Sequence, residues 1–167
     1  LADLRSTDGR ISVAVMQFQN MTNDTKLNIW QGGIQDNLIN NLTNSEGLNV
    51  KQSESVNALL QNQGITNYAS ITPSVAGKIS VKLDANVFIF GSINQSGSTI
   101  RVNAQLTDSK TGEILKSFKK EGSFKDGSMF PIIDPISEEI KNYLIISGLK
   151  EEVYMDPQRT GSSENPE

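Results

Sequence analysis

One continuous apolar run, followed by a strictly alternating one, constrains the fold of this chain more than any other feature. Residues 86–93 read NVFIFGSI, with four apolar side chains in succession at positions 87–90. Such a run is typical of a central strand that is covered on both faces. After a Ser-Gly-Ser-Thr turn, apolar and polar residues alternate from position 100 to 106. The two runs therefore predict an antiparallel hairpin whose first strand lies inside a sheet.

A further strand is expected over 114–122, after a turn in which Gly112 can adopt positive φ. Lysines at positions 116, 119 and 120 are typical of an edge strand that resists pairing with other chains. The sequence therefore predicts a three-strand meander that ends at the edge of the sheet.

Strands and helices alternate before this meander, and one more helix follows it. Apolar spacing predicts a buried strand over 11–18, a helix over 27–42 with Asp24 or Thr25 as its cap, and a short strand over 47–52. Two further helices are expected to begin at Ser53 and, with Thr72 as N-cap, at Pro73. The last helix is expected to open at Asp134 and Pro135 and to run through Leu144.

This element order predicts a three-layer α/β/α fold with a five-stranded mixed sheet of order 2-1-3-4-5. Strand 4 is antiparallel, because parallel crossovers are right-handed and a short meander must reverse direction. We expect a polar lead-in over 1–10, one α/β domain over 11–146 and a C-terminal extension and linker over 147–167. Because Leu1 is not an initiator Met, the chain is expected to be cut from a longer protein.

Composition argues against several classes of chemistry. The chain has no Cys and no His, so thiol nucleophiles, imidazole bases and nearly every structural zinc arrangement are excluded. Its net charge of -4 and its scattered Lys and Arg do not favour nucleic acid as a partner. Asp36, Asp84 and Asp108 are expected on separate elements, where they serve turns and solvation. We therefore expect no enzyme activity, no cofactor, no metal and no membrane span.

Three segments carry a resemblance to a known family. They are a hydrophobic strand that ends in Gln-Phe-Gln-Asn at 17–20, a helix that opens with Gly-Gly at 32–33, and a hairpin with Ala-Gln-Leu-Thr-Asp at 104–108 followed by Thr-Gly. Together they resemble the TolB N-terminal-domain-like family of bacteria over about residues 11–144. One departure is Gln17, where that family usually has Pro.

The resemblance implies a non-catalytic module for assembly or sensing, with a fold like that of anticodon-binding domains. Members of that family occur beside tetratricopeptide repeats, Ser/Thr kinase or adenylate cyclase domains, or a periplasmic propeller. The first hypothesis is a protein-interaction module of the cell envelope, in the periplasm or otherwise extracytoplasmic. The alternative is a sensory domain that binds a small molecule and is attached to a kinase, a cyclase or a repeat protein, with a cytoplasmic location also open. The sequence does not predict the oligomeric state.

The loop after the first strand is the expected binding region. In open α/β sheets the crevice lies at the carboxyl ends of strands 1 and 3. The candidate recognition lip consists of Asn20, Thr22, Asn23 and Asp24, with Gly91 and Ser92 opposite. These residues offer amides, hydroxyls and one carboxylate but no base or nucleophile, so the lip can recognise a partner and is not expected to catalyse. The same residue types also serve a plain turn and a helix cap.

Overall fold

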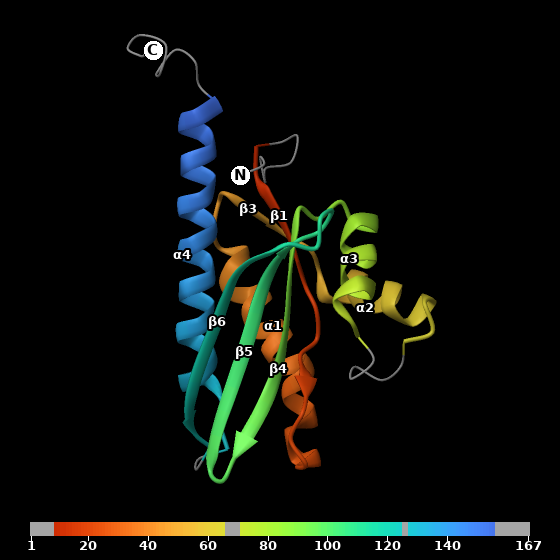
Figure 1. Ribbon diagram of the computed structural model, residues 1–167, viewed down its shortest axis with the longest axis vertical. Coiled ribbons are helices and arrows are strands. Elements are labelled where there is room, and N and C mark those ends of the chain that lie inside the picture. Colours follow the sequence, from red (N-terminus) through yellow and green to blue (C-terminus); the bar gives the residue numbers. More distant parts are fainter. Residues whose placement is uncertain (1–8, 66–70, 125–126, 156–167) are drawn as a thin grey trace.

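The computed structural model describes residues 9–65, 71–124 and 127–155. The chain folds around one mixed sheet with strand order β3-β1-β4-β5-β6 (Figure 1). β1 (Ile11–Val15) is parallel to β3 (Leu48–Val50) and to β4 (Val87–Ser96), while β5 (Thr99–Asp108) and β6 (Ile114–Ser123) continue as an antiparallel meander. The predicted order, with its reversed fourth strand, is therefore confirmed.

Helices cover both faces of the sheet. The 3-10 helix η1 (Thr25–Asn28) leads into α1 (Ile29–Thr43), and α1 packs with α4 (Phe130–Met155) on one face. α2 (Ser53–Asn62) and α3 (Pro73–Lys82) cover the other face, and Figure 1 shows the two pairs on opposite sides of the sheet. The predicted three-layer α/β/α arrangement is confirmed.

The continuous apolar run lies where the sequence predicts it, in the middle of the sheet. Val87 and Ile89 are buried in the core beneath α1 and α4, and Phe88 is buried in the second core beneath α2 and α3. Successive residues of a strand point to opposite faces, so a run without polar interruption fits only a strand that is covered twice.

Most local capping and turn signals also form as predicted. Thr72 accepts a hydrogen bond from the Val75 amide at 3.2 Å, with Pro73 in the first turn of α3. Asp24 accepts from the Lys26 amide at 3.0 Å and caps η1 rather than α1, which begins at Ile29, two residues later than predicted, without a side-chain cap. Gly112 has a φ of 75° in the turn between β5 and β6. Each of these signals depends on residues within a few positions, so the sequence alone is enough to specify it.

The start of the last helix differs from the prediction. α4 begins at Phe130, so Pro135 lies inside the helix rather than at its first position. Pro135 removes one backbone hydrogen bond of the helix. The buried residues Ile132 and Ile133 extend the apolar stripe of Ile136 by one turn, and the burial of these side chains offsets that loss.

The first strand is shorter than predicted, and part of the expected chain is not described. β1 ends at Val15, and the chain then re-enters the sheet as β2 (Gln19–Asn20), which pairs with β4. Residues 1–8 of the expected lead-in and 156–167 of the expected linker lie outside the described residues.

Candidate functional site

The structure brings the predicted lip and the distal half of β4 together. Gln19 is opposite Ser92 and Asn20 is opposite Ile93 in the parallel ladder of β2 and β4. The Met21 amide extends this ladder by donating to the Ile93 carbonyl oxygen at 2.9 Å. Backbone hydrogen bonds therefore join the two sides of the expected crevice.

Asn20 is the centre of a hydrogen-bond network inside the lip. Its Oδ1 accepts from the Thr22 amide at 3.0 Å and from the Thr22 hydroxyl. Its Nδ2 donates to the Asp24 carbonyl oxygen at 3.0 Å and to Asn28 Oδ1 at 2.7 Å. The Asn20 amide also donates to Gln31 Oε1 at 3.0 Å. These contacts use the polar groups of Asn20 to shape the loop and to fix it to α1.

The other predicted lip residues have different structural roles. Asp24 caps η1, and Asn23 is exposed to solvent. The Ser92 hydroxyl accepts from Asn94 Nδ2 at 3.1 Å. Gly91 is buried, and a Cβ atom placed there would overlap the ring of Phe18. Gly91 therefore has a structural reason to be glycine.

Partly or largely exposed apolar side chains occur in this loop and at the beginnings of α1 and α4. Met21 is 58% exposed, Ile29 is 78% exposed and Phe130 is 48% exposed. Trp30 is half-buried and packs edge-to-face against Phe130, with 5.4 Å between the ring centroids. We call Met21, Ile29, Trp30 and Phe130 the apolar tip. Figure 1 shows the beginnings of α1 and α4 at the lower end of the view.

Sequence reasoning missed the apolar tip. The helical spacing predicts that Trp30 belongs to the core, whereas the structure places it at the margin of the core against an exposed ring. Ile29 precedes the buried stripe of α1, so its exposure depends on where the helix begins. An aromatic residue in the first turn of a helix, after a polar loop, is the one signal in the sequence that could have indicated this surface.

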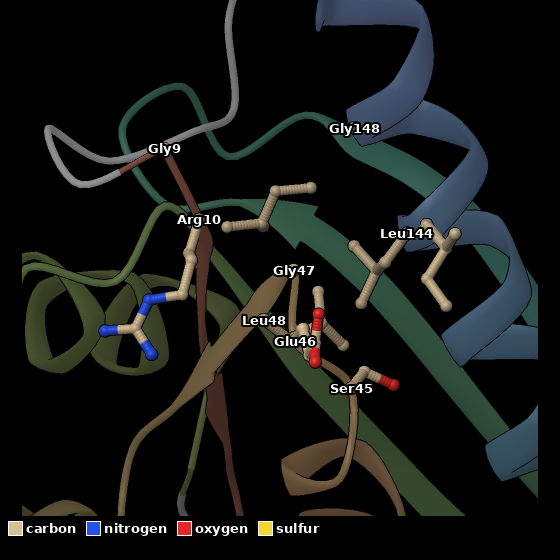
Figure 2. A pocket seen from close by; sticks show the side chains of 10 residues that line it. Gly9, Arg10, Ser45, Glu46, Gly47, Leu48, Leu144 and Gly148 are labelled. Carbon is tan, nitrogen blue, oxygen red and sulfur yellow. The ribbon is translucent and has the colours of Figure 1, made fainter.

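Two hollows lie away from the lip. The first, of about 490 Å³, lies between the start of β1, the loop before β3 and the second half of α4. Figure 2 shows the Leu144 side chain turned toward Leu48, while the Arg10 side chain extends away from Leu144. The second, of about 520 Å³, lies between α3 and the turn that joins β5 to β6. Neither hollow belongs to the crevice that the sequence analysis expected.

Residues 9–65, 71–124 and 127–155 contain no group of three or more His, Cys, Asp or Glu that could hold a metal ion. In the same part of the chain no helix is both long and apolar enough to cross a membrane. Asp36 lies on α1, Asp84 follows α3, and Asp108 ends β5, where its carboxylate accepts from the Lys110 and Thr111 amides. The three carboxylates thus lie on separate elements, as expected.

Comparison with known proteins shows a shared fold. No family model matches the chain. The LpoB C-terminal domain from Salmonella enterica aligns with a TM-score of 0.53 and 20% identity, over 68% of this chain and 82% of that one. Lipoprotein GNA1162 from Neisseria meningitidis aligns with a TM-score of 0.57 and 19% identity, over 80% and 98%. TolB from Acinetobacter baumannii aligns with a TM-score of 0.50 and 14% identity, over 84% and 28%.

Among curated proteins, the chain is 29% identical over 133 residues to "Putative adenylate cyclase 3" of Rhizobium meliloti (strain 1021). The match covers 80% of this chain and spans 21% of the length of that protein. A segment similar to this chain thus occurs within a much longer protein. The solved structures show that the α/β fold is the one found in LpoB, GNA1162 and TolB.

Proposed function

We propose that this chain is a non-catalytic protein-interaction module of a cell-envelope protein, and that the apolar tip is its contact surface. The exposure of Ile29, Met21 and Phe130 at one end of the molecule carries this proposal. Exposed apolar side chains that gather beside polar residues are typical of protein-protein contact sites. Aromatic residues and Met are enriched in the centres of such interfaces.

The hydrogen bonds of the lip support a protein partner over a small ligand at this end. Asn20 bonds to Thr22, Asp24 and Asn28, so its side-chain amide is already used within the loop. Beside it, the exposed Asn23 and the exposed apolar side chain of Met21 remain accessible. Such a surface contributes to binding by the burial of apolar area.

The comparisons support the envelope part of the proposal. LpoB, the lipoprotein GNA1162 and TolB share this fold, and the sequence resembles the TolB N-terminal-domain-like family. A periplasmic or otherwise extracytoplasmic location follows from that likeness as a proposal. Fractionation of the full-length protein in its own host tests it: recovery with periplasmic and outer-membrane markers is expected, and recovery with cytosolic markers would contradict it.

Site-specific photo-crosslinking tests the contact surface. We expect that replacing Ile29 by photoreactive benzoylphenylalanine in the full-length protein gives a discrete protein adduct in the cell. Ile114 is the matched control, because it is also an exposed isoleucine, at 51%, but lies on β6. The additional variant Met21→Gln should weaken the adduct from position 29. Identical adducts from positions 29 and 114, or no adduct from position 29, would overturn the proposed surface.

A regulatory domain attached to a cyclase, a kinase or a repeat protein is the second candidate. The similarity to part of a longer protein named as a cyclase favours it. The neighbouring domains in the full-length gene discriminate between the two candidates. A cyclase or kinase domain beside this chain would favour regulation, and an envelope anchor or a propeller would favour assembly.

A further inference from the structure

The hollow between α3 and the turn from β5 to β6 combines positive charge with an unsatisfied buried hydroxyl. Lys78 and Lys82 come from α3, and Lys110 comes from the turn. Ser109, the first residue after β5, and Phe88 line the same hollow. We call this the lysine hollow. Its volume of about 520 Å³ lies in the range of small-molecule sites.

The charge of the lysine hollow is opposite to that of the protein as a whole. The chain has a net charge of -4, yet three ammonium groups and no carboxylate are found among the residues that line the hollow. Among the described residues, none of these three lysines forms an ion pair. Two of these lysines have an acidic residue two positions away in the chain, which is Asp84 for Lys82 and Asp108 for Lys110. In the described part of the chain, neither aspartate is ion-paired to a lysine of the hollow, and Asp108 accepts hydrogen bonds from the amides of its own turn. The positive charge is therefore available to an anion.

Ser109 supplies an independent observation that points to a ligand. It is only 7% exposed, and its Oγ is the one buried side-chain polar atom without a hydrogen-bond partner in the described part of the chain. A buried polar group without a partner is costly, and native proteins rarely leave one. A ligand oxygen in the hollow would satisfy this hydroxyl.

Ser109 directly follows β5 and lies on the side of the sheet that faces the hollow. Its amide donates to the Asn86 carbonyl oxygen at 3.0 Å, which continues the β4-β5 ladder beyond the pair of Val87 and Asp108. Cross-strand neighbours share a face, and alternate residues of a strand share a face. Ser109 is therefore on the side of Phe88, which is the side that α3 covers.

A glycine in α3 keeps the floor of the hollow open. A Cβ atom at Gly77 would lie 3.5 Å from the Ser109 carbonyl oxygen and 3.8 Å from Phe88 Cε1, which is ordinary contact. The space beside Ser109 is thus free because Gly77 has no side chain. Ser109 and the three lysines belong to the residues that line the hollow on this side of the sheet.

We propose that the lysine hollow binds a soluble phosphate monoester. A phosphate group carries up to two negative charges near neutral pH and offers three acceptor oxygens, which match the ammonium groups and the Ser109 hydroxyl. Lysine binds phosphate as a point charge and needs no bidentate geometry. Val81, which is 47% exposed at the rim, offers apolar contact to the organic part of the ester. This site is separate from the apolar tip and does not depend on its function.

Titration of the folded protein with phenyl phosphate, followed by amide chemical shifts in NMR, tests the proposal. We expect saturable shifts at the Gly77, Ser109 and Lys110 amides, and weaker binding of inorganic phosphate, which lacks an apolar part. Ser109→Ala should weaken phenyl phosphate binding about tenfold, because it removes a hydrogen bond to a charged oxygen. The same variant should melt at the same temperature or higher, because it removes an unsatisfied buried hydroxyl.

Charge variants test phosphate binding in a second way, which holds even if Ser109→Ala disturbs the fold. Lys78→Gln combined with Lys110→Gln should abolish saturable binding. Lys26→Gln is the matched control, because Lys26 lies in η1, at the far end of the view from α3 (Figure 1). Absence of saturable shifts in the unmodified protein, or equal affinity in the double variant and the Lys26 control, would overturn the proposal.

Discussion

The ring of Phe18 lies directly against Gly91, so that a Cβ atom at position 91 would overlap both this ring and the carbonyl oxygen of Asn103. Phe18 follows β1 in the chain and is fully buried, and Gly91 is in the middle of β4. Because Gly91 has no side chain, the Phe18 ring can stay in the core while the chain passes from β1 to β2.

Gly91→Ala should therefore lower the free energy of unfolding by about 3 kcal/mol, at the upper end of typical overpacking costs. The backbone oxygen of Asn103 cannot rotate away as a side chain could. Urea denaturation measures the effect. Gly47→Ala is the control, because a Cβ atom there meets nothing within 4 Å. Equal midpoints for the two variants would contradict this packing.

Phe88→Ala should cost about 3 to 5 kcal/mol, because the ring is only 1% exposed and its removal leaves a cavity under α3. Phe130→Ala is the matched comparison, since Phe130 is about half-exposed and contacts Trp30 by one ring edge. That variant should cost about 1 kcal/mol. Thermal and chemical denaturation of both variants provide the measurement, and a loss below about 1 kcal/mol for Phe88→Ala would be inconsistent with a central β4.

Asn20→Ala and Asn23→Ala separate the structural part of the lip from its exposed part. Asn20→Ala should cost about 1 to 2 kcal/mol, because several hydrogen bonds within the loop and to Asn28 are lost. Asn23 is exposed, so Asn23→Ala should change stability by less than about 0.5 kcal/mol. Circular dichroism melting curves compare the two variants. An unchanged curve for Asn20→Ala would mean that the network does not brace the loop.

Gln35→Ala should destabilise the fold although it replaces a polar residue in a helix by a better helix former. Gln35 is buried, and its Nε2 donates to the Val15 carbonyl oxygen at 2.8 Å and to Asn57 Oδ1 at 3.2 Å. The loss is expected at about 1 to 3 kcal/mol, the range for a buried polar group that loses its partner. Asp36→Ala, at the exposed neighbouring position, should be close to neutral in the same denaturation experiment.

The sequence predicts those parts of the fold whose causes are local. Thr72 and Pro73 specify the start of α3, and the run from Val87 to Phe90 specifies a strand buried on both faces. The strand order follows from these elements, because few topologies remain once crossovers are right-handed. The resulting α/β arrangement is the one that the structure shows.

The site features depend on contacts between distant segments, and the sequence does not predict them. Gln35 is polar within an apolar helix face, and only its position beside Val15 explains its burial. Pro135 is predicted to start the last helix, but the helix begins at Phe130 because Ile132 and Ile133 are buried in the core. Pro135 therefore lies inside the helix. In the sequence, Ser109 looks like an ordinary turn residue. The structure shows that its buried hydroxyl has no hydrogen-bond partner among the described residues.

The strand order also has a consequence for the order of folding events. The meander of β4, β5 and β6 is contiguous in the chain, whereas β1 meets β4 across a separation of 74 positions between Ser12 and Asn86. Closing a long loop delays the contacts that need it, so the meander is expected to form early and the parallel half to dock later. The amide protons of β3, a three-residue strand at the margin, should exchange with deuterium through openings that leave the meander protected.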